Sequence, residues 1–197
     1  EIGLEKGDRV AVMMPNLLQN PIALFAILRA GMVVVNTNPL YTARELKHQL
    51  NDSGAKVIII VENFAHVLQD VIDETKIEHV ITTKMGDMLS PVKGFIINTV
   101  VKYIKKMVPA FKLKNAVTFK QALKLGAQHD FHTVPSNHDD IAFLQYTGGT
   151  TGVSKGAVLT NKNMVANMLQ ASAWINDFIG DKKAPSLPLY RCIIFFL

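Results

Sequence analysis

Short apolar runs alternate with segments of helical period along the first part of the chain. The clearest run, Lys56–Val61, ends in five consecutive β-branched residues. A run that is apolar on both faces is typical of a strand buried inside a parallel sheet. Similar runs predict strands at Asp8–Met14, Met32–Val35 and His79–Thr82.

The segments between these runs carry helix start and stop signals. Asn20 is a suitable N-cap, with Pro21 at the first helical position, and Gly31 follows Ala30 where such a helix would end. We therefore expect a helix between the first two strands.

Two further helices are expected around the third strand. The sequence from Thr42 to Glu45 forms a capping box, and Gly54 ends that helix. Glu62–Lys76 has helical period, with one apolar face made of Phe64, Val67, Leu68, Val71 and Ile72. Strand and helix thus alternate, which predicts a doubly wound α/β fold with a mostly parallel sheet.

The alternation pauses in a basic segment, residues 91–125. Eight lysines and no acidic residue lie between Asp87 and Asp130, so the net charge of +5 becomes −3 for the rest of the chain. Val92–Met107 has an apolar stripe beside Lys102, Lys105 and Lys106, and Pro109 is expected to end this helix. Such a helix is typical of a membrane surface or partner contact, and equally of a solvated surface helix.

A second short helix is expected after the basic one. It spans Thr118–Leu125, and Gly126 closes it. The polar stretch His129–Asp140 then reads as a loop that leads into another strand.

That strand precedes the most distinctive part of the chain. The apolar runs Ile141–Leu144 and Ala157–Leu159 enclose a loop with four glycines, five hydroxyl groups and one lysine. Glycines let backbone N–H groups approach anionic oxygens, and lysine adds a mobile positive charge. The loop is therefore predicted to bind phosphate through Tyr146, Thr147, Gly148, Gly149, Thr150, Thr151, Gly152, Val153, Ser154, Lys155 and Gly156. A plain glycine-rich hairpin turn is the alternative, but it would need only two or three special residues.

Two common nucleotide motifs do not fit this loop. A Walker A loop requires lysine directly after glycine and a helix behind it, whereas Lys155 follows Gly152 by three residues and precedes an apolar run. A Rossmann fingerprint fails because Gly148 and Gly149 are adjacent.

Other groups of polar residues are weaker candidates. We expect a solvated loop and no metal site where the histidines and aspartates cluster, at His129, Asp130, His132, His138, Asp139 and Asp140, because their spacing matches no compact zinc pattern. His48 and His66 are expected at surface positions of helices. The single cysteine, Cys192, has no partner base that would make it a nucleophile.

Asn36–Pro39 follows a predicted strand, so it is expected at the carboxyl edge of the sheet, where α/β folds bind ligands. Side chains that only satisfy the backbone of a turn are an equally good interpretation. Met13 and Met14 are expected in the core.

Composition narrows the class of protein. With 49% apolar residues among 197, the chain can build one sizeable core. One cysteine fits a reducing compartment, and neither a leader nor a bilayer-spanning run is visible. A cytoplasmic domain is therefore expected.

The loop resembles the phosphate-loop signature of the adenylate-forming (AMP-binding) superfamily, which includes acyl-CoA synthetases. Gly148 in place of the usual serine, with Leu144-Gln145 before the loop and Thr160–Met164 after it, is most similar to bacterial long-chain fatty-acid–CoA ligases. The resemblance extends upstream through residues 7–11 and 14–16 to 36–41.

The resemblance implies a partial N-terminal domain over residues 1–190, truncated at both ends. Residues 187–190 resemble the family's next characteristic segment, after which residues 191–197 depart from it as a divergent tail. The implied activity joins a fatty acid to coenzyme A with ATP and Mg²⁺. The adenine, ribose and catalytic-lysine residues would fall beyond Leu197, so the 197 residues alone are expected to be inactive.

Two alternatives remain beside the enzyme. One is a non-catalytic remnant, and the other is a basic module that binds membrane or nucleic acid. Nucleic-acid binding is disfavoured because Phe95 and Tyr103 fall on the apolar stripe and no reader motif is present. Peripheral membrane contact through Lys93–Lys114, on the inner face of the membrane, is compatible with either an enzyme or a module.

Overall fold

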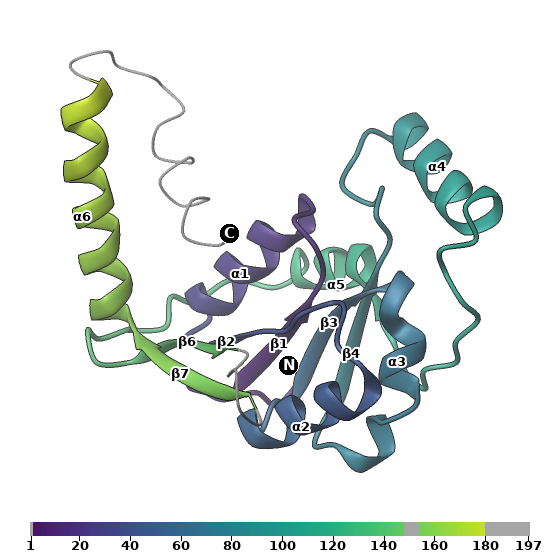
Figure 1. Ribbon diagram of the computed structural model, residues 1–197, viewed down its shortest axis with the longest axis horizontal. Coiled ribbons are helices and arrows are strands. Elements are labelled where there is room, and N and C mark those ends of the chain that lie inside the picture. Colours follow the sequence, from purple (N-terminus) through teal and green to yellow (C-terminus); the bar gives the residue numbers. More distant parts are fainter. Residues whose placement is uncertain (1, 148–153, 180–197) are drawn as a thin grey trace.

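The computed structural model describes residues 2–147 and 154–179. Its strands form one sheet in the order β5-β4-β3-β1-β2-β6-β7 (Figure 1). Neighbouring strands are parallel except β6 and β7, which are antiparallel. The strands are β1 (Arg9–Met13), β2 (Val33–Asn36), β3 (Val57–Val61), β4 (His79–Thr83), β5 (Val117–Thr118), β6 (Ile141–Thr147) and β7 (Lys155–Thr160). The predicted α/β class and its four early strands are confirmed.

Helices connect the strands in the expected alternation. The α-helices are α1 (Gln19–Arg29), α2 (Ala43–Ser53), α3 (Ala65–Gln69), α4 (Pro91–Thr99), α5 (Phe119–Gly126) and α6 (Asn161–Ile179). Short 3-10 turns at η1 (Glu62–Phe64) and η2 (Ile72–Glu74) flank α3, and a π-helical turn, η3 (Val100–Ile104), extends α4. None of these helices, within the ranges described, combines the length and apolar character needed to cross a membrane.

Successive side chains of each buried strand point to opposite sides of the sheet, so the sheet has two apolar faces. Helices cover both of them. Val10 and Val12 of β1 belong to one core cluster, which α1 and α5 complete. Ala11 and Met13 belong to the other, which α2 and α3 complete. This three-layer arrangement is the doubly wound fold, and Met13 lies in its core as expected.

The start of α1 differs from the prediction. The helix begins at Gln19, and neither Asn20 nor the N-cap Leu18 makes a side-chain capping bond. Gln19 is instead buried, and its Nε2 donates to Thr83 Oγ1 (3.1 Å) and to Lys84 O (2.7 Å). These tertiary hydrogen bonds draw the first turn against β4, so they outweigh a local cap.

The end of α1 agrees with the prediction. Gly31 has φ of +74°. The amide of Gly31 donates to Leu28 O, and the amide of Met32 donates to Ile27 O. This is the Schellman motif, and glycine is favoured there because the left-handed backbone places no Cβ under strain.

The helix predicted over Glu62–Lys76 is wrong as a continuous element. It is broken into η1, α3 and η2, and Val71 between the last two has φ of −128°, outside the helical range. Both Leu68 and Val71 are fully or nearly fully buried, three residues apart. This i,i+3 spacing is that of one helical face, so the predicted apolar face is buried here although the helix is interrupted.

The basic helix lies to one side of the three layers (Figure 1). Gly94 is the one buried residue of α4. The helix ends at Ile104 and not at Pro109, because Lys106 takes a left-handed conformation with φ of +51°.

Candidate phosphate-binding loop and neighbouring pocket

The predicted phosphate loop connects two paired strands. Tyr146 pairs with Gly156, and Thr147 pairs with Lys155, so the loop leaves β6 and returns into β7. The part of the hairpin interpretation that concerns topology is thus correct, although residues 148–154 separate the strands. Tyr146 is buried, Ser154 is half-buried, and Thr147 and Lys155 are exposed.

Six residues of the predicted site lie outside the described residues. They are Gly148, Gly149, Thr150, Thr151, Gly152 and Val153. Their assignment to phosphate binding stays a prediction.

The loop leaves the carboxyl end of β6, next to the carboxyl end of β2. Asn36 ends β2 and lies opposite Gln145 of β6, and its Nδ2 donates to Gln145 Oε1 at 2.8 Å. Open α/β sheets bind ligands at this edge. The candidate loop therefore has the position that the fold favours for a nucleotide.

The polar residues after β2 serve the backbone. Thr37 Oγ1 donates to Val35 O at 3.2 Å, and Leu40 N donates to Asn38 Oδ1 at 3.0 Å. Of the two interpretations of Asn36–Pro39, turn formation is the one that these contacts support.

Tyr146 fixes the base of the loop through its ring and its hydroxyl. The hydroxyl donates to Asp52 Oδ2 on α2. The ring lies so close to Gly156 that a Cβ there would approach Cε2 to 2.9 Å. Burial, and then the hydrogen bond to the Asp52 carboxylate, raise the pKa of Tyr146 above its ordinary value. The phenol is therefore a neutral donor, held against a carboxylate.

His48 contacts the other end of the loop, which corrects the expectation of an ordinary surface histidine. Its side chain is half-buried, and Nε2 lies 3.1 Å from Ser154 O. His66 is also half-buried, and its Nδ1 is a buried atom without a hydrogen-bond partner. No residue pattern in the sequence signals the contact of His48, because its partner is a backbone carbonyl.

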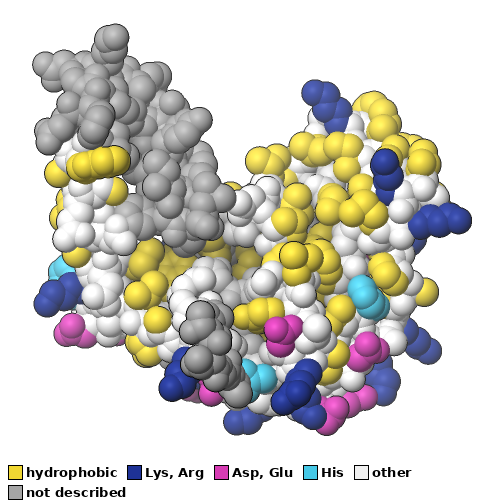
Figure 2. All heavy atoms as spheres, in the orientation of Figure 1, with side chains coloured by type: hydrophobic (Ala, Val, Ile, Leu, Met, Phe, Trp, Pro, Cys, Tyr) yellow, Lys and Arg dark blue, Asp and Glu magenta, His cyan; other side chains and the backbone are white. Residues whose placement is uncertain are grey.

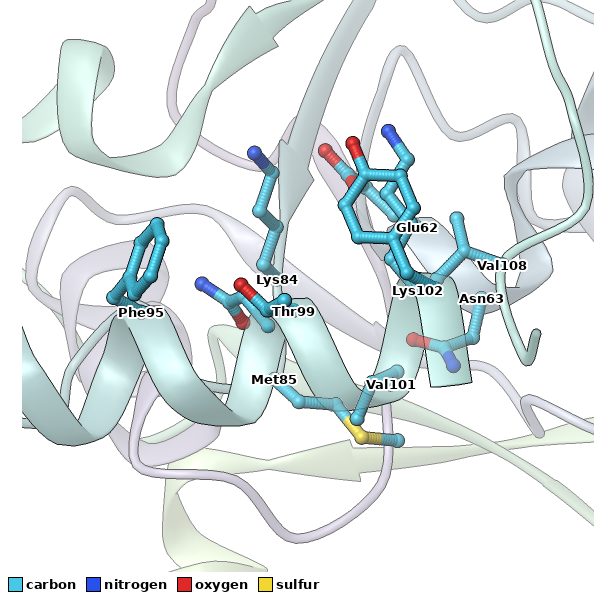
Figure 3. Close-up of a pocket in the computed structure, with 11 residues that line it drawn as sticks. Glu62, Asn63, Lys84, Met85, Phe95, Thr99, Val101, Lys102 and Val108 are labelled. Atoms are coloured by element: carbon cyan, nitrogen blue, oxygen red, sulfur yellow. The ribbon is translucent and has the colours of Figure 1, made fainter. Parts of the chain in front are cut away.

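A separate pocket lies along the same edge, between the helical segment of α4 and η3 and the residues that follow β3 and β4 (Figure 3). It has a volume of about 230 Å³. Glu62 and Lys84, which directly follow β3 and β4, line it together with Lys102 and the apolar side chains of Phe95 and Val101. Burial raises the pKa of Glu62, while the charges of the two lysines act in the opposite direction.

Sequence reasoning did not find this pocket, although charged residues directly after two buried strands were a visible signal. Strands β1 and β2 separate β3 from β6 in the sheet, so the pocket and the loop occupy different parts of the carboxyl edge.

The histidine and aspartate cluster has the environment of a solvated loop. His132, His138 and Asp139 are exposed. Within residues 2–147 and 154–179, no group of three or more His, Cys, Asp or Glu side chains is arranged to hold a metal ion. Cys192 lies outside these ranges.

Comparison with known proteins identifies the family. The model of the AMP-binding enzyme family matches residues 1–194. The chain belongs to this family. Among its relatives, the long-chain-fatty-acid–CoA ligase of Escherichia coli O6:H1 is 55% identical over 204 residues, which cover 98% of this chain and 36% of the relative. The ligase of the same name from Haemophilus influenzae is 52% identical, over 99% of this chain and 37% of that ligase.

Solved structures agree with the family assignment. A long-chain-fatty-acid–CoA ligase from Archaeoglobus fulgidus superposes with a TM-score of 0.65 at 29% identity, over 86% of this chain and 28% of that chain. An anthranilate CoA ligase in complex with anthranoyl-AMP superposes with a TM-score of 0.67 at 18% identity, over 85% of this chain and 28% of that chain, which shows that the fold is shared. The chain thus spans about a third of the length of the curated relatives that it matches.

Proposed function

We propose that the protein is a long-chain fatty-acid–CoA ligase. The observation that carries the proposal is the 55% identity to a ligase of that name over nearly the whole chain. The position of the loop at the carboxyl end of β6 supports it, because a nucleotide is expected at that edge. We expect the 197 residues alone to be inactive, since they span only about a third of the relatives.

The proposed reaction has two steps. A carboxylate oxygen of the fatty acid attacks the α-phosphorus of ATP, the bond to the bridging oxygen breaks, and pyrophosphate leaves. The thiolate of coenzyme A, after loss of the thiol proton, then attacks the acyl carbon, and AMP leaves. The protein must hold the triphosphate in line with the carboxylate and stabilise charge on the leaving pyrophosphate.

The loop supplies groups of the right chemistry for the β- and γ-phosphates. Hydroxyls of Thr147, Thr150, Thr151 and Ser154, the ammonium of Lys155 and the glycine amides are all donors to anionic oxygen. Mg²⁺ prefers phosphate oxygens plus one or two carboxylates over an all-protein cage.

The experiment that tests this function measures fatty-acid-dependent exchange between ATP and labelled pyrophosphate in the full-length protein. We expect exchange with long-chain acids, and acyl-CoA once coenzyme A is added. Exchange that depends on a short aromatic or amino acid, with none from long-chain acids, would contradict the substrate class.

A membrane contact of the basic segment is the second part of the proposal. Several large apolar side chains of α4 and η3 are exposed: Phe95 is 74%, Ile104 69% and Tyr103 67% exposed. Figure 2 shows hydrophobic side chains gathered over α4, with Lys or Arg side chains at their border. A helix that only presented a solvated lysine face would bury its stripe.

The occupant that fits this surface is an anionic bilayer, on the inner face of the membrane of a cytoplasmic enzyme. The apolar stripe would enter the headgroup region, and Lys93, Lys102, Lys105 and Lys106 would lie at the level of the lipid charges. Each lysine near such a surface contributes about 1 kcal/mol, and the effect fades within a Debye length of ~8 Å.

Vesicle co-sedimentation tests this contact. We expect the full-length protein to sediment with anionic vesicles at low salt and to remain in the supernatant with neutral vesicles. Ile104→Ser should reduce binding, whereas Leu169→Ser is a matched control because Leu169 on α6 is similarly exposed, at 65%. Equal binding by both variants, or binding that ignores lipid charge, would contradict the proposal.

A further inference from the structure

Helix α2 reaches both ends of the candidate loop. His48 and Asp52 lie one turn apart, on the same side of the helix. His48 Nε2 lies 3.1 Å from Ser154 O, directly before β7, and Asp52 accepts the hydroxyl of Tyr146, near the end of β6. One helical turn therefore joins the strand that enters the loop to the strand that leaves it.

Its own ends hold α2 firmly in place. At the start, Glu45 N donates to Thr42 Oγ1 and Thr42 N donates to the Glu45 carboxylate. At the end, Gly54 adopts φ of +61°, and the Arg9 side chain donates from Nε to Ser53 O at 3.0 Å and from Nη2 to Gly54 O at 2.9 Å.

The middle of α2 is fixed to the sheet as well. Leu46 and Leu50 are fully buried, and Gln49 Nε2 donates to Asn36 O at 2.8 Å, at the end of β2. The helix thus has fixed contacts to β1, β2 and the core. A side chain on this helix is a stable reference point for a loop.

The two members of the Tyr146–Asp52 pair each need the other. A buried phenol hydroxyl without an acceptor carries a desolvation penalty. The carboxylate of Asp52 lies in the last turn of α2, where the helix dipole disfavours negative charge. The hydrogen bond gives the phenol an acceptor and gives the carboxylate a donor.

We propose that His48 and Asp52 are positioning residues that hold the two ends of the ATP-phosphate loop at a fixed separation. This role rests on the proposed ligase function. Neither residue is assigned a contact with ATP: each acts on the loop through Ser154 or Tyr146. If the two ends of the loop are fixed before ATP binds, less conformational entropy is lost when the loop donors contact the pyrophosphate.

The test compares variants of the full-length protein in the fatty-acid-dependent pyrophosphate exchange assay. Tyr146→Phe removes only the hydroxyl and keeps the ring against Gly156, and Asp52→Ala removes the acceptor. We expect each to raise KM for ATP, or to lower exchange, by about tenfold to a hundredfold, with KM for the fatty acid unchanged. The double variant should be no worse than either single one, because both remove the same contact.

Conservative variants separate positioning from folding. Asp52→Asn retains an acceptor, so it should be more active in pyrophosphate exchange than Asp52→Ala. His48→Gln keeps a donor, so its exchange activity should be higher than that of His48→Ala. Asn51→Ala is the matched control: it removes a hydrogen bond of the same helix, from Nδ2 to Glu74 O at 2.9 Å, that does not reach the loop. It should lower the melting temperature without changing KM for ATP.

The outcomes distinguish the two claims. If the wild-type protein shows no fatty-acid-dependent exchange, the ligase function fails and this role fails with it. If the wild type is active but the loop variants behave like Asn51→Ala, or the double variant loses the product of the two single effects, the positioning role alone is overturned.

Discussion

The hydroxyl of Tyr146 donates a hydrogen bond to Asp52, a residue 94 positions earlier in the chain. The contact joins the last turn of α2 to the strand that enters the candidate loop. Asp52 itself lies outside the predicted loop motif, Tyr146–Gly156.

Loss of a loop donor should weaken the reaction without unfolding the protein. Lys155 is exposed, so Lys155→Ala removes a charge-assisted contact to phosphate and little packing. We expect a loss of about 2 kcal/mol of transition-state stabilisation, or some tens of fold in pyrophosphate exchange, and a similar loss for Thr151→Ala. Lys162→Ala on α6 is the control. Full exchange in both loop variants, with unchanged circular dichroism, would remove the loop from the site.

Gly156 should tolerate no side chain. An added Cβ would lie 2.9 Å from Cε2 and 3.0 Å from Cζ of Tyr146, a buried ring that the Asp52 contact holds in place. Gly156→Ala should therefore destabilise the fold by about 1–3 kcal/mol, measured by thermal unfolding. Gly126→Ala is the comparison, because a Cβ there meets nothing within 4 Å. Equal melting temperatures for the two variants would mean that the ring moves aside freely.

Arginine should be required at position 9. Its guanidinium donates to two carbonyls at the end of α2, a fork that lysine cannot reproduce from a single ammonium. Arg9→Lys should cost about 1–2 kcal/mol in the free energy of unfolding, whereas Arg44→Lys on the exposed side of α2 should cost little. Denaturant titration measures both, and an equal loss would argue that the fork contributes nothing.

Asp8 should make the stability depend on acid pH. The amide of Glu5 and the ammonium of Lys56 donate to its carboxylate, each at 2.9 Å, and hold the pKa of Asp8 below its ordinary value of 3.8. Because the folded-state pKa is depressed, this stabilisation is present above pH 3.8 and is lost as the pH falls through the folded-state value.

The difference in melting temperature between wild type and Asp8→Asn should accordingly be largest near neutral pH and shrink as the pH falls below 3.8. At the alkaline end, the hydrogen bond to Asp8 raises the pKa of Lys56, so the pair persists until the pH passes above 10.5. Asp139→Asn, at an exposed position, is the control. A difference that stays constant from neutral to acid pH would exclude the linkage.

The strands could be predicted because burial alone decides them. Val57–Val61 is apolar throughout and buried throughout. The capping box at Thr42 was also visible, since it depends only on residues three positions apart. Both features depend only on residues that are close together in the sequence, so the sequence alone was sufficient to predict them.

Two of the failures share one cause, which is a tertiary contact that outweighs a local preference. Gln19 bonds to β4 and starts α1 before Asn20. His48 looked like a surface residue because its partner, a backbone carbonyl of Ser154, has no signature in the sequence.

Helix α6 was missed although its start was readable. Asn163 N donates to Thr160 Oγ1, and Thr160 N donates to Asn163 Oδ1, which is a reciprocal cap of the capping-box type. Asparagine in place of the usual glutamate or glutamine made the pattern harder to recognise.

The place of β6 beside β2 has a consequence for the order of folding. Strands β1 to β5 assemble from residues 9–118, whereas Val34 pairs with Phe143 only after more than a hundred residues have been crossed. Closing so long a loop is entropically costly and slow. During synthesis on the ribosome, the valine-rich edge of β2 therefore stays unpaired until β6 emerges, which is the period when this chain is most prone to aggregation.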